Sequence, residues 1–127
     1  MGWGAFLQLE RLRMDCFLVI PCFNESARVP AFLGPLCRAI EASGLSVGLQ
    51  LVDDGSGSEE VQRLRKLVAK CRDHYPFLTE VYAMGKNRGK GAAIRNGWGL
   101  APDDARVLGF VDADDGGQAA GAVVADS

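Results

Sequence analysis

The chain has 127 residues, of which 48% are hydrophobic and 24% are charged, and its formal net charge at pH 7 is −2. This composition is typical of one folded globular domain and excludes a disordered chain. The slightly acidic balance provides no basic field for holding nucleic acid through its phosphates, so we expect no nucleic-acid partner.

An N-terminal extension, residues 1–15, precedes a series of alternating strand-like and helix-like segments. The apolar run CFLVIP, residues 16–21, predicts a strand that is buried on both faces. Apolar residues at helical spacing over 28–42 predict a helix that stops at the next glycine. The run VGLQLV, residues 47–52, predicts a second strand. Ser58 is expected to cap the helix that follows.

The second half of the chain continues this alternation. The segment LTEVYAM, residues 78–84, predicts a third strand, and a glycine-rich turn and a short helix follow over 85–91 and 92–101. The segment RVLGFVD, residues 106–112, predicts a fourth strand. Strands that alternate with helices predict an α/β fold, a parallel sheet with flanking helices. Because ligands of such sheets lie beyond the carboxyl ends of the strands, the four polar turns should line one cleft.

Several familiar binding motifs do not fit these turns. The Gly89–Lys90 pair lacks the earlier glycine and the following hydroxyl of a phosphate-binding P-loop. Glu60 stands where a dinucleotide fingerprint needs its third glycine. The aspartates after the fourth strand lack the closing glutamate of a calcium-binding EF-hand loop. The four cysteines have no CxxC spacing, which argues against a zinc site and favours buried free thiols.

Taken together, the four turns resemble the nucleotide-binding half of a family 2 glycosyltransferase with the type A fold. The first strand ends in VIPCFNE, the second ends in LVDDGSGSE, NRGKGAAIRNG follows the third, and the fourth ends in FVDADD. The set is most similar to the polyprenyl-phosphate (dolichyl-phosphate) glucosyl- and mannosyltransferases, over residues 16–115. Each motif alone is weak, but four in this order at successive strand ends are specific.

The resemblance implies a divalent metal, Mg²⁺ or Mn²⁺, at the Asp-x-Asp turn after the fourth strand. Asp112 and Asp114 would form the metal site, with Asp114 as the direct ligand. Asp112 and Ala113 would also contact the ribose and phosphate of the nucleotide. A divalent ion neutralises the charge that develops on a leaving diphosphate, and carboxylate oxygens are the hard ligands that these two ions prefer.

The resemblance also implies a donor pocket. The contacts to the nucleobase and ribose would come from the ends of the first two strands, at Pro21, Phe23, Glu25, Leu51 and Asp53. Phe23 replaces a tyrosine that is common in the resembling enzymes, which keeps the stacking surface and removes a hydroxyl. Lys90 would direct a positive charge at the phosphates. Asp54 and Ser56 are expected to hold their turn through side-chain to backbone hydrogen bonds, and Trp98 is expected to pack in the core.

The activity that the resemblance implies is metal-dependent transfer of a sugar from a nucleotide-sugar donor to a lipid phosphate. UDP-glucose is favoured as the donor over GDP-mannose, and the expected acceptor is dolichyl or polyprenyl phosphate. The expected location is the cytoplasm, including the cytoplasmic face of a membrane. Membrane association is not encoded in this sequence, because no apolar run approaches the roughly 20 residues that a membrane-spanning helix needs.

The resembling enzymes continue well beyond the aspartate pair, whereas twelve residues follow Asp115 in this sequence. The segment 16–127 is therefore expected to be an incomplete glycosyltransferase domain, with the chain truncated after the Asp-x-Asp motif. Two alternatives remain open at this point. One is an inactive nucleotide-sugar-binding fragment or isoform. The other is a nucleotidyltransferase, which also combines a parallel sheet with an acidic metal site.

Overall fold

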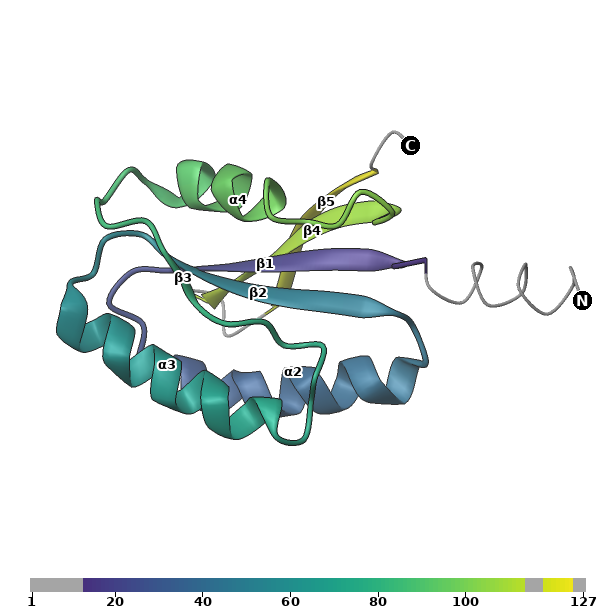
Figure 1. Cartoon of the computed structure of the whole chain (residues 1–127), viewed down its shortest axis with the longest axis horizontal. Helices are drawn as coiled ribbons and strands as arrows, with labels where there is room; N and C mark the ends of the chain where they lie inside the picture. Colours follow the sequence, from purple (N-terminus) through teal and green to yellow (C-terminus); the bar gives the residue numbers. More distant parts are fainter. Residues whose placement is uncertain (1–12, 114–117, 125–127) are drawn as a thin grey trace, which may run out of the picture.

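The computed structural model describes residues 13–113 and 118–124, and the described strands form one five-stranded sheet (Figure 1). The elements in chain order are β1 (Cys16–Cys22), α2 (Val29–Ser43), β2 (Val47–Asp53), α3 (Ser58–Arg72), β3 (Tyr82–Ala83), α4 (Lys90–Trp98), β4 (Val107–Asp112) and β5 (Gln118–Val124). The order of strands across the sheet is β3-β2-β1-β4-β5. The first four strands are parallel, and β5 runs antiparallel to β4 at one edge. The predicted α/β fold with a parallel sheet and flanking helices is confirmed.

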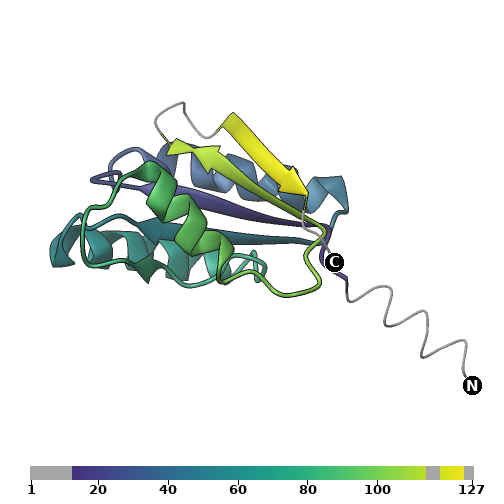
Figure 2. The ribbon, with the colours of Figure 1, turned by 90° about the horizontal axis from the view of Figure 1, so that it is seen from above.

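Helices α2 and α3 cover one face of the sheet, and α4 covers the other (Figures 1 and 2). The side chains of β1 alternate between these faces because successive residues of a strand point to opposite sides. Phe17 and Val19 pack in the core on the α4 side, whereas Ile20 and Cys22 pack in the larger core against α2 and α3. Strand β2 is buried along its whole length, as expected for a parallel strand between two layers of helix.

The helix ends follow the sequence in one case and differ from it in another. Helix α2 stops at Gly44, which adopts a left-handed conformation with φ 72° and confirms the predicted glycine stop. The predicted cap of α3 is wrong, because Ser58 is the first residue of that helix and makes no capping hydrogen bond. Gly57 occupies the cap position with φ 103°, a value that suits glycine and strains other residues. The first turn of α3 carries Glu59 and Glu60 instead, whose negative charges interact favourably with the positive N-terminal end of the helix dipole.

The third strand is much shorter than the seven residues predicted for it. Only Tyr82–Ala83 forms a strand, and Leu78 makes one isolated bridge to Leu49. Between them, the buried side chain of Gln50 replaces part of the backbone ladder. Its Nε2 donates to the carbonyl oxygen of Glu80 at 2.6 Å, and its Oε1 accepts from the hydroxyl of Thr79 at 2.7 Å. This side chain interrupts the regular strand pairing that the apolar pattern predicts.

The antiparallel strand β5 was not predicted from its small-residue sequence, QAAGAVV. It pairs with β4 from Val107 opposite Val124 to Asp112 opposite Gln118, with a register shift between Phe110 and Val111. Within the parts of the chain that the structure describes, no helix is both long enough and apolar enough to cross a membrane.

Candidate functional site

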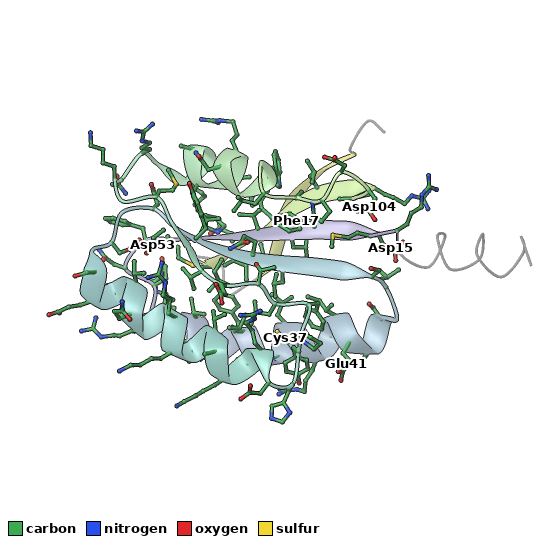
Figure 3. All side chains as sticks on the ribbon, in the orientation of Figure 1. Asp15, Phe17, Cys37, Glu41, Asp53 and Asp104 are labelled. Carbon is green, nitrogen blue, oxygen red and sulfur yellow. The ribbon has the colours of Figure 1, made fainter. Side chains whose placement is uncertain are left out.

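The candidate site lies where the carboxyl ends of β1, β2 and β4 meet. Figure 3 shows Asp53, the last residue of β2, at the opposite end of the sheet from Asp15 and Asp104. A pocket of about 60 Å³ opens at this end, and turns after three different strands contribute to it. Its lining residues are Pro21, Cys22, Phe23, Glu25, Asp54 and Lys90. Four of the residues predicted for the donor pocket, Pro21, Phe23, Glu25 and Lys90, therefore come together.

A larger hollow of about 230 Å³ lies between α3 and the segment before β3. Its rim carries Arg65 and Arg72, and Arg72 is paired with Glu80 at 3.2 Å. This hollow is not at the carboxyl ends of the strands. We assign the candidate site to the smaller pocket because parallel sheets bind their ligands at those ends.

Asp53 is buried directly behind the pocket lining, which includes its neighbour Asp54 but not Asp53 itself, and its two carboxylate oxygens differ in hydrogen bonding. Its Oδ2 accepts a hydrogen bond from the backbone N–H of Ser56 at 2.8 Å, while Oδ1 has no hydrogen-bond partner among the described residues. The side chain is only 1% exposed. Because buried polar atoms are nearly always hydrogen-bonded, Oδ1 stands out as an acceptor without a donor among the described residues.

The next residue, Asp54, holds the turn between β3 and α4. Its carboxylate accepts hydrogen bonds from the backbone N–H groups of Arg88 at 2.7 Å and Gly89 at 2.9 Å. It also accepts from Nδ2 of Asn87 at 3.1 Å. Ser56 holds a different turn, because its hydroxyl accepts from the backbone N–H of Asn24 at 2.7 Å. The predicted side-chain to backbone hydrogen bonds are present, but they reach turns that are far apart in sequence instead of holding the residues' own turn.

Phe23 and Glu25 occupy the turn after β1 with different exposure. Phe23 is 45% exposed, so its ring is accessible at the pocket. Glu25 is 8% exposed, and its Oε2 lies 3.7 Å from Nε of Arg28. Leu51 is fully buried in the core against α2 and α3, and the structure does not bring it into the pocket.

Lys90 and Asp112 form an ion pair across the site. The Lys90 ammonium donates to Oδ2 of Asp112 at 2.7 Å, and the two side chains are 44% and 13% exposed. The pair joins the start of α4 to the end of β4, 22 residues later. Ala113, the next residue, packs its side chain in the core, so any contact with a nucleotide falls to its backbone.

The predicted metal site is only partly within the described residues. Asp112 is described, and Asp114, the expected direct ligand, lies outside the described ranges. In residues 13–113, no three His, Cys, Asp or Glu side chains group closely enough to hold a metal ion. Asp112, whose Oδ2 accepts from Lys90, would supply one hard oxygen donor to a metal, and a second carboxylate and ligand oxygens would have to complete the coordination.

Sequence reasoning missed a link between the turn after β1 and the start of α3. Glu60 accepts hydrogen bonds from the backbone N–H of Ser26 at 3.2 Å and from its hydroxyl at 2.9 Å. It also accepts from Arg63 at 2.9 Å. The Ser26 hydrogen bonds, with a smaller contribution from the charge of Arg63, hold the pKa of Glu60 below its ordinary value. The two residues are 34 positions apart, and no local pattern signals their contact.

Trp98 was expected to pack, and it does. Its ring lies against the core on the α4 side, and its Nε1 donates to the backbone oxygen of Gly109 at 2.9 Å.

Comparison with known proteins identifies a family for this arrangement. The sequence model of the family described as Glycosyl transferase family 2 matches residues 17–116. No curated protein sequence matches the chain significantly.

Two solved structures are similar to this chain. One is TarS 1-349 of S. aureus, with 20% identity and a TM-score of 0.58. The other is the mannosyltransferase PcManGT from Pyrobaculum calidifontis in complex with GDP-Man and Mn²⁺, with 20% identity and a TM-score of 0.59. In each case the match covers 80% of this chain and 28% of the solved chain. At this identity the similarity establishes a common fold, that of the nucleotide-binding half of a type A glycosyltransferase.

Proposed function

Because this chain belongs to glycosyl transferase family 2, we propose that it forms the donor-binding part of an enzyme that transfers a sugar from a nucleotide-sugar. The observation that carries this proposal is the pocket at the strand ends, which places an exposed aromatic ring near a lysine–aspartate pair. An aromatic ring suits a nucleobase, and a cation suits the phosphates. Membership of the family favours glycosyl transfer over the nucleotidyltransferase alternative.

In this proposal Phe23 stacks on the base and Asp53 selects it. The unpartnered Oδ1 of Asp53 is an acceptor, so it matches a base that offers an imino N–H. Uracil and guanine offer one, whereas neutral cytosine has an acceptor at N3 and donates only through its exocyclic amine, so Oδ1 placed opposite N3 lacks a donor. A buried acceptor that is left without a donor costs about 1–3 kcal/mol, which corresponds to roughly tenfold or more in affinity. UDP and GDP should therefore bind more tightly than CDP.

The diphosphate would lie toward Lys90 and Asp112. The residues proposed to hold Mg²⁺ or Mn²⁺ are Asp112 and Asp114, and Asp112 provides a carboxylate at the strand end that suits either ion. When bound, a divalent ion neutralises charge on the leaving diphosphate. Lys90 contributes a fixed positive charge beside Asp112, which balances that carboxylate and attracts the phosphates. The presence of GDP-Man and Mn²⁺ in the solved mannosyltransferase supports this assignment by analogy.

For the donor and acceptor we propose UDP-glucose, with GDP-mannose as the second choice, and dolichyl or polyprenyl phosphate. Support comes from the turn NRGKGAAIRNGW, which resembles the glucosyltransferase branch of the lipid-phosphate enzymes. A lipid-phosphate acceptor would place the reaction at the cytoplasmic face of a membrane. Transfer of labelled glucose from UDP-glucose to dolichyl phosphate tests this choice. UDP binding without transfer to any lipid phosphate would support a binding module instead.

Base selectivity tests the proposed donor pocket most sharply. We expect calorimetry to rank UDP above CDP, and Asp53→Ala should reduce both to similar low affinities. Asp104→Ala is the matched control, because Asp104 is an exposed aspartate at the opposite end of the sheet (Figure 3). If selectivity between UDP and CDP survives in Asp53→Ala, base recognition lies elsewhere and this pocket assignment is wrong.

A further inference from the structure

The turn between β3 and α4 is held against the end of β2 from two sides. On one side, the Asp54 carboxylate accepts from the backbone N–H groups of Arg88 and Gly89, and its own backbone oxygen accepts from Nδ2 of Asn87 at 3.0 Å. On the other side, the main chain of the turn lies directly on Gly55. A Cβ atom at Gly55 would lie 2.2 Å from the backbone nitrogen of Asn87, so only glycine permits this approach.

Helix α4 begins at Lys90, the residue that follows the two amides held by Asp54. This position fixes where the Lys90 side chain starts. A lysine side chain has a flexible four-carbon stem, so a fixed backbone sets the centre of the volume that its ammonium group can reach. Here the ammonium reaches Asp112 at 2.7 Å. A continuous series of contacts therefore runs from Asp54 through the turn and Lys90 to the Asp-x-Asp segment.

Asp54 is 3% exposed, and both of its carboxylate oxygens accept hydrogen bonds from the turn. Hydrogen bonds from backbone N–H groups to a carboxylate are stronger than those between neutral groups. Although Asp54 lines the pocket, both of its carboxylate oxygens are engaged by the turn, so we expect its effect on a ligand to pass through the residues that it holds.

We infer that Asp54 is a positioning residue that fixes the start of α4 so that Lys90 faces the phosphates of a nucleoside diphosphate. This inference rests on the proposed function, and it adds a role that Asp54 performs through the turn it holds. Asp54 acts on the phosphate end of the nucleotide, whereas Asp53, its neighbour, acts on the base. Two adjacent aspartates at one strand end thereby serve opposite ends of the same ligand.

The test compares UDP with uridine, which lacks the phosphates. In the wild type UDP should bind more tightly than uridine because of Lys90. Asp54→Asn keeps the size of the side chain but exchanges one acceptor for an NH₂ donor, which repels one of the held N–H groups. We expect UDP to bind about tenfold more weakly to this variant while uridine affinity stays unchanged, since a charge-assisted hydrogen bond is lost at the turn.

A double-mutant cycle with Lys90→Met separates positioning from a general structural role. If Asp54 acts through Lys90, then Asp54→Asn should have no further effect on UDP binding once Lys90 is replaced. A merely structural role predicts equal losses for UDP and uridine in both backgrounds, which would overturn the inference. Asp104→Asn, an exposed change at the other end of the sheet, is the charge-matched control and should alter neither affinity.

Asn87→Ala keeps the test decisive if Asp54→Asn does not fold. Asn87 is exposed, and its replacement removes its two hydrogen bonds to Asp54 while the Asp54 carboxylate keeps those from Arg88 and Gly89. It should lower UDP affinity in the same direction by a smaller factor and leave uridine unchanged. A wild type that binds UDP no better than uridine would overturn the proposed function itself. A wild type that prefers UDP, with variants that keep the full preference, would overturn only the positioning role of Asp54.

Discussion

The close contact between α4 and the sheet at Gly97 gives a stability prediction that can be worked out from the structure. A Cβ atom at this position would lie 2.6 Å and 2.7 Å from the two methyl carbons of Val19, and 3.0 Å from a methyl carbon of Val52. Both valines are fully buried and belong to β1 and β2. Gly97→Ala therefore forces α4 away from the sheet, and α4 carries Lys90 at its first residue.

Overpacking a core by one methyl group costs about 1–3 kcal/mol. Replacing glycine by alanine within a helix stabilises by about 0.5–1 kcal/mol, which offsets part of this cost. Gly91, in the same helix, provides a matched control because an added Cβ there meets only the guanidinium of Arg95 at 3.2 Å, the far end of a flexible side chain. Gly91→Ala should therefore gain the stabilisation that alanine gives a helix without the cost of overpacking the core. The two variants should differ by about 1–3 kcal/mol.

The assay is urea unfolding followed by circular dichroism, with the same slope expected for both variants. Gly91→Ala should raise the urea midpoint above that of the wild type. The free energy of unfolding of Gly97→Ala should be about 1–3 kcal/mol lower than that of Gly91→Ala. Equal midpoints for the two variants would mean that α4 does not pack on β1 and β2 as described. The position of Lys90 would then have to be reconsidered as well.

Three further predictions concern single side chains. Phe23→Ala should weaken UDP binding by about 1–3 kcal/mol, the value of one base–aromatic stack. The urea midpoint should stay unchanged because the ring is outside the core, and a lowered midpoint would show that Phe23 stabilises the fold instead. Because the pKa of Glu60 is lowered from its ordinary value of 4.5, its carboxylate stabilises the folded state at pH values above 4.5. Glu60→Gln should therefore have a lower free energy of unfolding than the wild type at pH 7, and this difference should disappear as the pH falls below 4.5. A difference that does not change with pH would contradict this. Burial, and then the charge of Cys71, raise the pKa of the Cys37 thiol to about 11, so peptide mapping should find Cys37 unalkylated by iodoacetamide at pH 8 until urea unfolds the chain. Labelling of native Cys37 as fast as in urea would place it outside the core.

The parts of the fold that the sequence predicted well are those specified by local patterns. Continuous apolar runs identified β1 and β2, because strands buried on both faces carry few polar residues. Gly44 marked the end of α2 because a left-handed residue closes that helix. The meeting of polar turns at one sheet edge followed from parallel topology alone, and the pocket at that edge confirms it.

The features that escaped prediction depend on contacts between distant positions. Strand β3 is short because the Gln50 side chain takes hydrogen bonds that a regular ladder would make, and an apolar pattern does not reveal this. The contacts of Glu60 with Ser26 and of Lys90 with Asp112 span 34 and 22 residues. From residue type alone, charged side chains such as Glu60 and Lys90 would be expected on the surface. Only the fold brings each pair together, so the gathering of these turns at one end of the sheet was predictable and the pairing of their side chains was not.

The central claim is that the strand-end site binds a nucleoside diphosphate with a divalent ion at the Asp-x-Asp turn. The most direct measurement is calorimetric titration of UDP into the folded 127-residue chain, with Mn²⁺ and again with a chelator, for the wild type and for Asp114→Ala. We predict tighter UDP binding with Mn²⁺ in the wild type and no difference between the two conditions in Asp114→Ala. UDP binding that is indifferent both to Mn²⁺ and to this substitution would contradict the account.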